Sequence, residues 1–221
     1  MIPPQANAEF VARMEDILDL YQQVDDPDCP LVCFDEGSKQ LLGESRQPYP
    51  ARPGRPARYD YAYQHAGVCN LFMCFEPLRG KRDVVCYPRR TQQEWALWVK
   101  HLVDDLYPAA ARIRLVLDNL NTHTLAALYL HFPPDEARRL AAKLELHYTP
   151  KHGSWLNMAE IELSVLARQC LNRRMDSLLF VQAQVTAWQT ARNAAAASIH
   201  WRFTTADARI RLKHLYPTFH L

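Results

Sequence analysis

Two apolar segments of the sequence end in an aspartate. Residues 31–34, LVCF, are followed by Asp35, and residues 113–117, IRLVL, are followed by Asp118 and Asn119. A charged carboxylate at the end of a buried strand is unfavourable unless a partner compensates its charge. Taken singly, each aspartate fits a solvated strand end or a turn. Taken together, the two positions indicate carboxylates gathered around a cation.

A third acidic position lies near the start of a helix expected over residues 156–172, where Glu160 and Glu162 are both candidates. These two residues lie roughly 200° apart around a helix, so only one of them can face a given site. Glu160 has a rival role as the N3 residue of a capping box whose N-cap is Asn157. Helical periodicity does not choose between the two glutamates, because neither lies on a clearly solvent-facing stripe.

Three convergent carboxylates predict a site for divalent cations. Ligands that are all oxygen suit Mg²⁺ or Mn²⁺ rather than zinc. Two such ions about 3.5–4 Å apart clamp an in-line displacement at phosphorus, activating a water or a 3′-hydroxyl and stabilising the leaving oxygen. The six cysteines include no CxxC pair and several lie in apolar runs, so we expect reduced, buried thiols rather than zinc ligands.

The composition is that of one globular domain, with 48% hydrophobic and 23% charged residues. A formal net charge of +2 neither favours nor excludes a polyanionic partner. The N-terminal residues lack the apolar segment of a signal peptide, and no apolar run approaches the roughly 20 residues that span a bilayer. We therefore expect a cytoplasmic protein with no membrane partner.

Local patterns predict helices interleaved with strands. We expect helices at residues 8–22, 91–107, 156–172 and 177–197, and a largely helical segment at 123–142 that is broken by Pro133-Pro134. Strands are expected at 31–34, 68–77, 81–88, 112–119 and 144–148. The Pro- and Gly-rich residues 43–58 are expected to be irregular. This order of elements predicts an α/β fold in which helices pack on the faces of a mixed sheet.

Four segments in this order, LVCFDE, CNLFMCFEPLRG, LVLDNLNTH and HYTPKHGSWLNMAEIELSVLARQCL, resemble the catalytic domain of a bacterial insertion-sequence transposase of the Tc/mariner-related DDE superfamily. The resemblance implies a ribonuclease H-like fold, with a mixed five-stranded sheet and helices on both faces. This catalytic domain would cover residues 25–221, including a helical and basic C-terminal extension, and a helix within residues 1–24 would precede it.

The same resemblance implies a catalytic, metal-binding triad of Asp35, Asp118 and Glu160, supported by Asn119 and Asn157. It chooses Glu160 over Glu162, with two Mg²⁺ (or Mn²⁺) ions per site. The implied reaction is cleavage of phosphodiester bonds at transposon ends and transfer of the 3′-OH end to target DNA, carried out by a homodimer. The alternative is a truncated transposase or a domesticated nuclease that binds or nicks DNA without strand transfer.

DNA must reach these carboxylates, so cationic side chains should surround them. The candidates are Arg52, Arg55, Arg58, Lys151, His152, Arg173 and Arg174. His123 is expected to be structural rather than catalytic. Transposases of this type usually carry an N-terminal helix-turn-helix module, and too few residues precede Asp35 to form one. Sequence recognition would then come from a separate subunit or domain.

Overall fold

The computed structural model describes residues 2, 5–45, 49–56, 62–120 and 122–218, and a mixed sheet forms its centre. The strands are β1 (Leu31–Glu44), β2 (Tyr63–Glu76), β3 (Lys81–Tyr87), β4 (Ile113–Leu117) and β5 (Leu144–Tyr148), in the spatial order β3-β2-β1-β4-β5. β2 is antiparallel to β1 and β3, whereas β4 is parallel to β1 and β5. The expected α/β fold with a mixed five-stranded sheet is confirmed.

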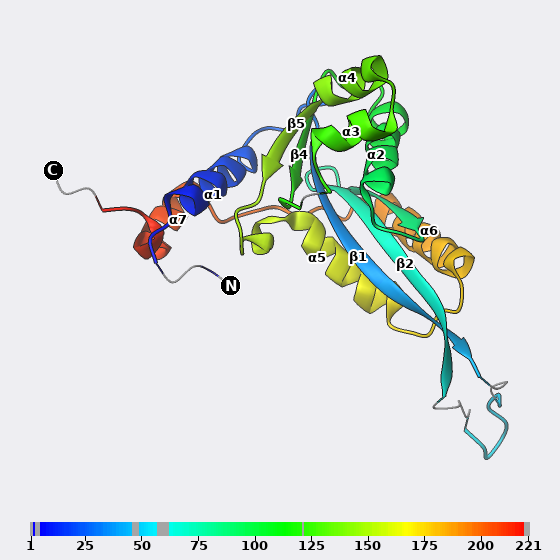
Figure 1. Ribbon diagram of the computed structural model, residues 1–221. Helices are drawn as coiled ribbons and strands as arrows, with labels where there is room; N and C mark the ends of the chain where they lie inside the picture. Colours follow the sequence, from blue (N-terminus) through cyan, green and yellow to red (C-terminus); the bar gives the residue numbers. More distant parts are fainter. Residues whose placement is uncertain (1, 3–4, 46–48, 57–61, 121, 219–221) are drawn as a thin grey trace.

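Helices cover both faces of the sheet (Figure 1). One face carries α2 (Gln92–His101), α3 (Leu125–His131) and α4 (Pro134–Ala142), and the other carries α1 (Ala8–Leu20), α5 (Met158–Leu166), α6 (Leu178–Ala194) and α7 (Thr205–Arg211). The alternation of side chains along β1 explains this two-sided burial: Phe34 enters the core beneath α2, and Cys33 enters the core beneath α1 and α5. None of the described helices is long and apolar enough to cross a membrane.

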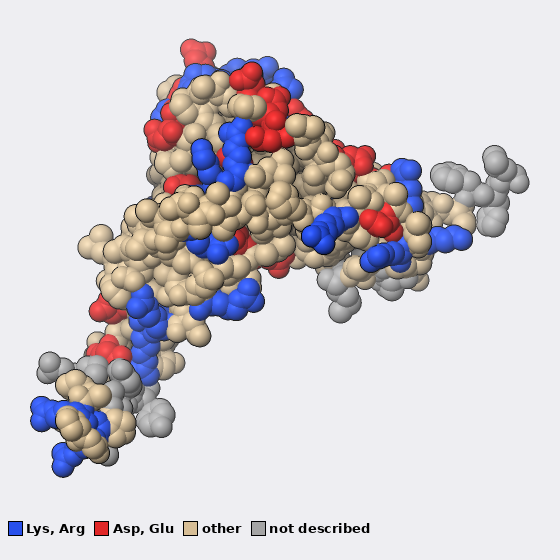
Figure 2. All heavy atoms as spheres, turned by 180° about the vertical axis from the view of Figure 1, so that it is seen from behind, with Lys and Arg blue, Asp and Glu red and all other residues tan. Residues whose placement is uncertain are grey.

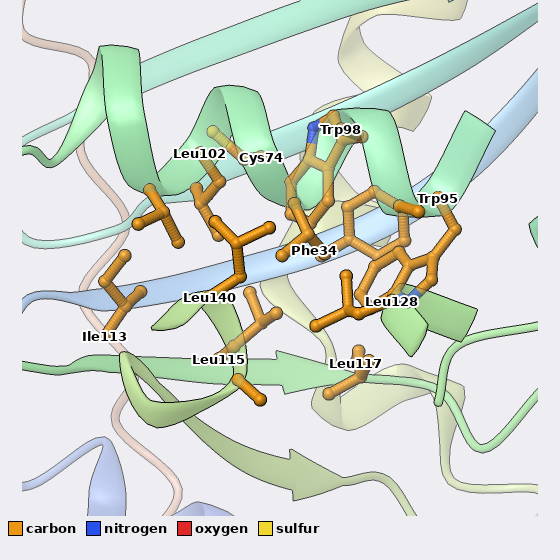
Figure 3. Packing of buried hydrophobic residues seen from close by; sticks show 14 of the residues in the cluster. Phe34, Cys74, Trp95, Trp98, Leu102, Ile113, Leu115, Leu117, Leu128 and Leu140 are labelled. Carbon is orange, nitrogen blue, oxygen red and sulfur yellow. The ribbon is translucent and has the colours of Figure 1, made fainter. Parts of the chain in front are cut away.

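The core beneath α2 is built around aromatic rings (Figure 3). The ring of Phe34 lies 4.1 Å from that of Trp98 and 5.1 Å from that of Trp95, measured between centroids. All three side chains are almost completely buried, and each such burial contributes about 1.5–3 kcal/mol. This packing fixes β1 against α2 at the residue that immediately precedes Asp35.

β1 and β2 continue beyond the sheet as a two-stranded arm, which we define as residues 38–45 and 62–68 with the described tip 49–56 (Figure 1). Sequence patterns missed these outer halves because their residues are mostly polar or exposed, and backbone pairing rather than burial makes them strands. The tip is also more regular than expected: Arg52 and Arg55 exchange backbone hydrogen bonds of 2.9 and 2.8 Å. Lys and Arg side chains follow the arm to its tip (Figure 2).

Helix α6 covers the free edge of β3. Its side-chain oxygens accept hydrogen bonds from backbone N–H groups of the strand. Asn193 accepts from Arg82 (2.9 Å), Gln189 accepts from Val84 (2.9 Å), and Gln182 accepts from Cys86 (3.3 Å). The Asn193 amide also donates to the Arg82 carbonyl (2.8 Å). Alternate residues of a strand point their N–H groups to the same side, so one face of α6 takes the place of a sixth strand.

The six cysteines are free thiols, and five of them are buried. Burial raises the pKa of the Cys33 thiol to about 11 and raises the pKa of Cys74 still further. Both groups are therefore neutral thiols at physiological pH. The expectation of reduced cysteines in the core agrees with this arrangement.

Candidate active site

The sheet places Asp35 and Asp118 at equivalent positions on neighbouring strands. β1 and β4 are parallel, and the last pair in their register joins Cys33 to Val116. Each aspartate lies two residues beyond that pair: Asp118 directly follows β4, whereas β1 continues past Asp35 to Glu44, so the expected strand end at Asp35 is wrong. Neighbouring strands lie about 4.8 Å apart, so the chain topology alone places these two acids side by side, just beyond the last pair of β1 and β4. This place is called the sheet edge below.

Helix α5 contributes Glu160 rather than Glu162 to this edge. Asn157 caps the helix, because its side-chain oxygen accepts the N–H of Ala159 (3.1 Å) while its amide donates to the Phe34 carbonyl (2.7 Å). The start of α5 is thereby tied to the residue before Asp35. Glu160 is exposed beside this junction, and with Asp35 it lines a depression of about 500 Å³. Glu162 is completely buried on the other side of the helix.

Asp35 is the most perturbed carboxyl group of this site. Its pKa is raised to about 7, first by burial and then by the negative charges of Asp118, Glu160 and Glu36. The N–H of Glu36, 2.7 Å from Oδ1 of Asp35, opposes this shift. The structure therefore brings the three predicted acids into electrostatic contact, and their mutual repulsion favours a proton or a metal cation at Asp35.

The donor set of this edge fits Mg²⁺ or Mn²⁺, because it consists of carboxylate oxygens that repel one another. Among the described residues, no three His, Cys, Asp or Glu side chains lie close enough together to hold one ion. Asp118 is instead hydrogen-bonded to His123, and Glu160 is exposed in the depression that it lines with Asp35.

His123 lies at the sheet edge as a bridge between two carboxylates. Its Nδ1 is 2.6 Å from Oδ1 of Asp118, and its Nε2 is 2.9 Å from Oε1 of the buried Glu36. Burial alone would lower the pKa of His123, but the hydrogen bonds to Asp118 and Glu36 raise it to about 9. The imidazolium therefore donates both bonds at neutral pH. Sequence reasoning gave Glu36 no role, because an isolated buried acid changes no periodic pattern.

Replacing His123 with Ala is expected to lower the free energy of unfolding by about 2–3 kcal/mol near neutral pH. Among the described residues, buried Glu36 then keeps only the more exposed Arg90 as an ionic partner. The pKa of His123 is raised in the folded protein from its ordinary value of 6.5, so protonated His123 stabilises the fold fully below pH 6.5. This stabilisation is lost as the pH rises through about 9 and the imidazole loses its proton. Urea unfolding of both proteins across this range should show the difference shrinking. A difference independent of pH would contradict the bridge, and His131→Ala, an exposed histidine on α3, is the control.

Asp35→Asn is expected to stabilise the metal-free protein at pH 8, by on the order of 3 kcal/mol. With a folded pKa of about 7 against an ordinary 3.8, the wild-type carboxyl binds its proton more tightly when folded, so wild-type stability falls as the pH rises between these values. Thermal unfolding should show this gain at pH 8 and little of it near pH 4.

Mn²⁺ should raise the unfolding temperature of the wild type at pH 8 and leave Asp35→Asn unaffected. An equal response to Mn²⁺ would contradict metal binding at Asp35, and Asp176→Asn, an exposed acid, is the control.

The predicted cationic residues fall into three groups. Lys151 and His152 lie beside the site, because they line the same cavity as Asp118. Arg52 and Arg55 lie at the tip of the arm, away from the carboxylates, and Arg58 lies outside the described residues.

Arg173 and Arg174 brace the fold. Arg173 donates to Gln184 and lies over the Phe180 ring. Arg174 pairs with Glu44 at 3.0 Å and lies over Tyr63, at the outer end of the paired strands of the arm. Both guanidinium groups therefore have partners within the chain, which the sequence position at a helix end did not reveal.

Comparisons with known proteins bear on the family and the fold of this chain. Residues 30–179 match the family described as DDE superfamily endonuclease, which covers more than half of the chain. Similar solved structures are the Mos1 mariner paired end complex with Mn (TM-score 0.56, 15% identity) and the Mos1 transposase paired-end complex with left transposon end (TM-score 0.55, 15% identity). Each match covers 89% of this chain and 60% of the Mos1 chain, and at this identity it shows the shared ribonuclease H-like fold. No curated protein matches the sequence. The chain belongs to the DDE superfamily of endonucleases.

Proposed function

We propose that this chain is the catalytic domain of a DNA transposase, which cleaves phosphodiester bonds at transposon ends and transfers the 3′-OH end to target DNA with two divalent cations. The observation that supports the proposal is that Asp118 and Glu160 lie near enough to Asp35 to raise its pKa, within a DDE superfamily domain. The Mos1 structures of similar fold are paired end complexes with Mn or with a transposon end, which supports DNA and divalent metal as partners here.

Each residue of the site has a role in this proposal. Asp35, Asp118 and Glu160 would hold the ions, which supply activation of the attacking oxygen and stabilisation of the leaving oxygen when bound. His123 occupies Oδ1 of Asp118 and so leaves Oδ2 available to a ligand. Asn157 fixes the start of α5 against β1, which sets the position of Glu160 relative to Asp35. No side chain has to act as a covalent nucleophile.

Conversion of supercoiled plasmid to nicked circles, in Mn²⁺ and in Mg²⁺, tests the cleavage step. The wild-type chain should nick the plasmid, and Asp118→Asn should not, because it removes a charged metal ligand. Nicking that persists in Asp118→Asn, or no nicking with any divalent metal, would overturn the proposal. The exposed Asp176→Asn controls for purification and folding.

A joining assay separates transposition from simple hydrolysis. Labelled duplexes with free 3′-hydroxyl ends are incubated with plasmid, and covalent joining is followed on a denaturing gel. Joined products would support strand transfer, whereas nicking without joining would assign the chain to nucleases that lack it. Cleavage of two ends by two copies further predicts a dimer on paired ends, which sedimentation of the chain with and without such duplexes measures.

A further inference from the structure

A second cavity, of about 560 Å³, opens beside Asp118. Its lining comes from three separate elements: residues of α1 and its cap, the residues that follow β4, and the loop of residues 149–154 between β5 and α5. The volume lies within the range of about 300–1,000 Å³ that is usual for ligand sites in proteins. The cavity is thus large enough for a nucleotide unit.

The rim of this cavity carries basic side chains next to acidic ones. Arg13, Lys151 and His152 line it, against the carboxylates of Glu9 and Asp118. Lys151 and His152 are exposed, and neither forms a hydrogen bond or ion pair within the described part of the chain. Arg13 pairs with Glu9 at 2.9 Å, a surface contact between residues one helical turn apart that contributes little energy. Lys151 is therefore available to an anionic ligand, and Arg13 becomes available when a ligand replaces Glu9.

The elements that carry these cations are held in place. Helix α1 buries Phe10 and Met14 in the sheet core, so the backbone at Arg13 is fixed. In the loop, His152 has a φ of +67°, a conformation that costs a non-glycine residue energy and is found most often at functional sites. The N–H of Gly153 closes this turn on the Pro150 carbonyl (2.8 Å). Positions that are fixed before binding favour recognition of a ligand of defined shape.

We propose that this cavity binds the sugar-phosphate backbone of the DNA strand that continues from the scissile phosphate, with Arg13 and Lys151 each contacting a phosphate group. The inference rests on the proposed function and deepens it, because it assigns a DNA contact to α1, a helix outside the family match. The ligand phosphate takes the place of Glu9 beside Arg13. Contacts of this kind position the duplex without reading its sequence.

Fluorescence anisotropy of a dye-labelled DNA duplex of arbitrary sequence, measured in the Glu160→Gln background to prevent cleavage, tests this site. For each protein, the logarithm of the binding constant is plotted against the logarithm of salt concentration. Arg13→Ala should weaken binding and reduce the magnitude of the slope by about 0.9, the value for one phosphate contact. Arg13→Lys should restore most of the slope, and Glu9→Gln should tighten binding. Circular dichroism confirms that each variant is folded.

Arg138→Ala, which removes an exposed arginine on α4, is the matched control and should leave the slope unchanged. An Arg13→Ala slope equal to that of Arg138→Ala would overturn the assignment of Arg13, while plasmid nicking by the wild type would leave the proposed function standing. Absence of any duplex binding by the wild type would overturn both.

Discussion

Glu160→Gln should reduce Mn²⁺-dependent plasmid nicking by about 10³-fold or more, while its thermal unfolding stays close to that of the wild type. The substitution removes a charged metal ligand, and metal-assisted stabilisation of the transition state is worth several kcal/mol, or one factor of ten for each 1.36 kcal/mol. The Glu160 side chain is exposed and has no hydrogen bond or ion pair in the part of the chain that the structure describes. Its removal therefore leaves no buried group without a partner.

A second readout follows from the same change. Glu160 is one of the charges that raise the pKa of Asp35, so Glu160→Gln should lower that pKa toward its ordinary value. Carbon-detected NMR titration of the Asp35 carboxyl measures this shift in the metal-free protein. Nicking reduced less than about tenfold, with the Asp35 pKa unchanged, would place the third acid elsewhere.

Glu162→Gln should instead lower the free energy of unfolding by about 3–5 kcal/mol, which is the usual effect of breaking a buried ion pair. Glu162 and Arg82 have completely buried side chains 3.0 Å apart, and Arg192 donates two further bonds to Glu162, of 2.6 and 3.0 Å. Without the carboxylate charge, the buried guanidinium of Arg82 loses its only anionic partner among the described residues. Equilibrium urea unfolding measures the loss.

Glu160→Gln makes the identical chemical change two residues away and serves as the control for this experiment. A loss of less than about 1 kcal/mol in Glu162→Gln would show that the buried cluster does not depend on its negative charge. Glu160→Gln should thus lower nicking without lowering stability, whereas Glu162→Gln should lower stability.

The sequence predicted the elements that apolar periodicity controls. β4 and β5, the two helices separated at Pro133-Pro134, and the apolar first part of β1 all depend on local patterns of buried residues. Periodicity could not choose between Glu160 and Glu162, because both helix stripes contain apolar residues. The physical distinction is the pairing of Glu162 with Arg82 and Arg192, which lie far away in the chain and meet only in the folded protein.

The outer part of the arm and the bridge at His123 were missed for related reasons. Residues 38–45, which are mostly polar, become a strand because β2 pairs with them. No pattern within these residues predicts that pairing. The buried bond between His123 and Glu36 joins residues 87 positions apart. The choice of Glu160, in contrast, came from the motif resemblance and remains a prediction until the Glu160→Gln variant is measured.

The side chains of α6 that cover β3 have a consequence for self-association. An uncovered strand edge invites backbone pairing with another copy, which leads to open-ended aggregates. Here the amide oxygens of Gln182, Gln189 and Asn193 already occupy N–H groups along that edge. Sheet extension across β3 would first have to detach α6. The β3 edge is therefore closed to backbone pairing with a second copy while α6 stays in place.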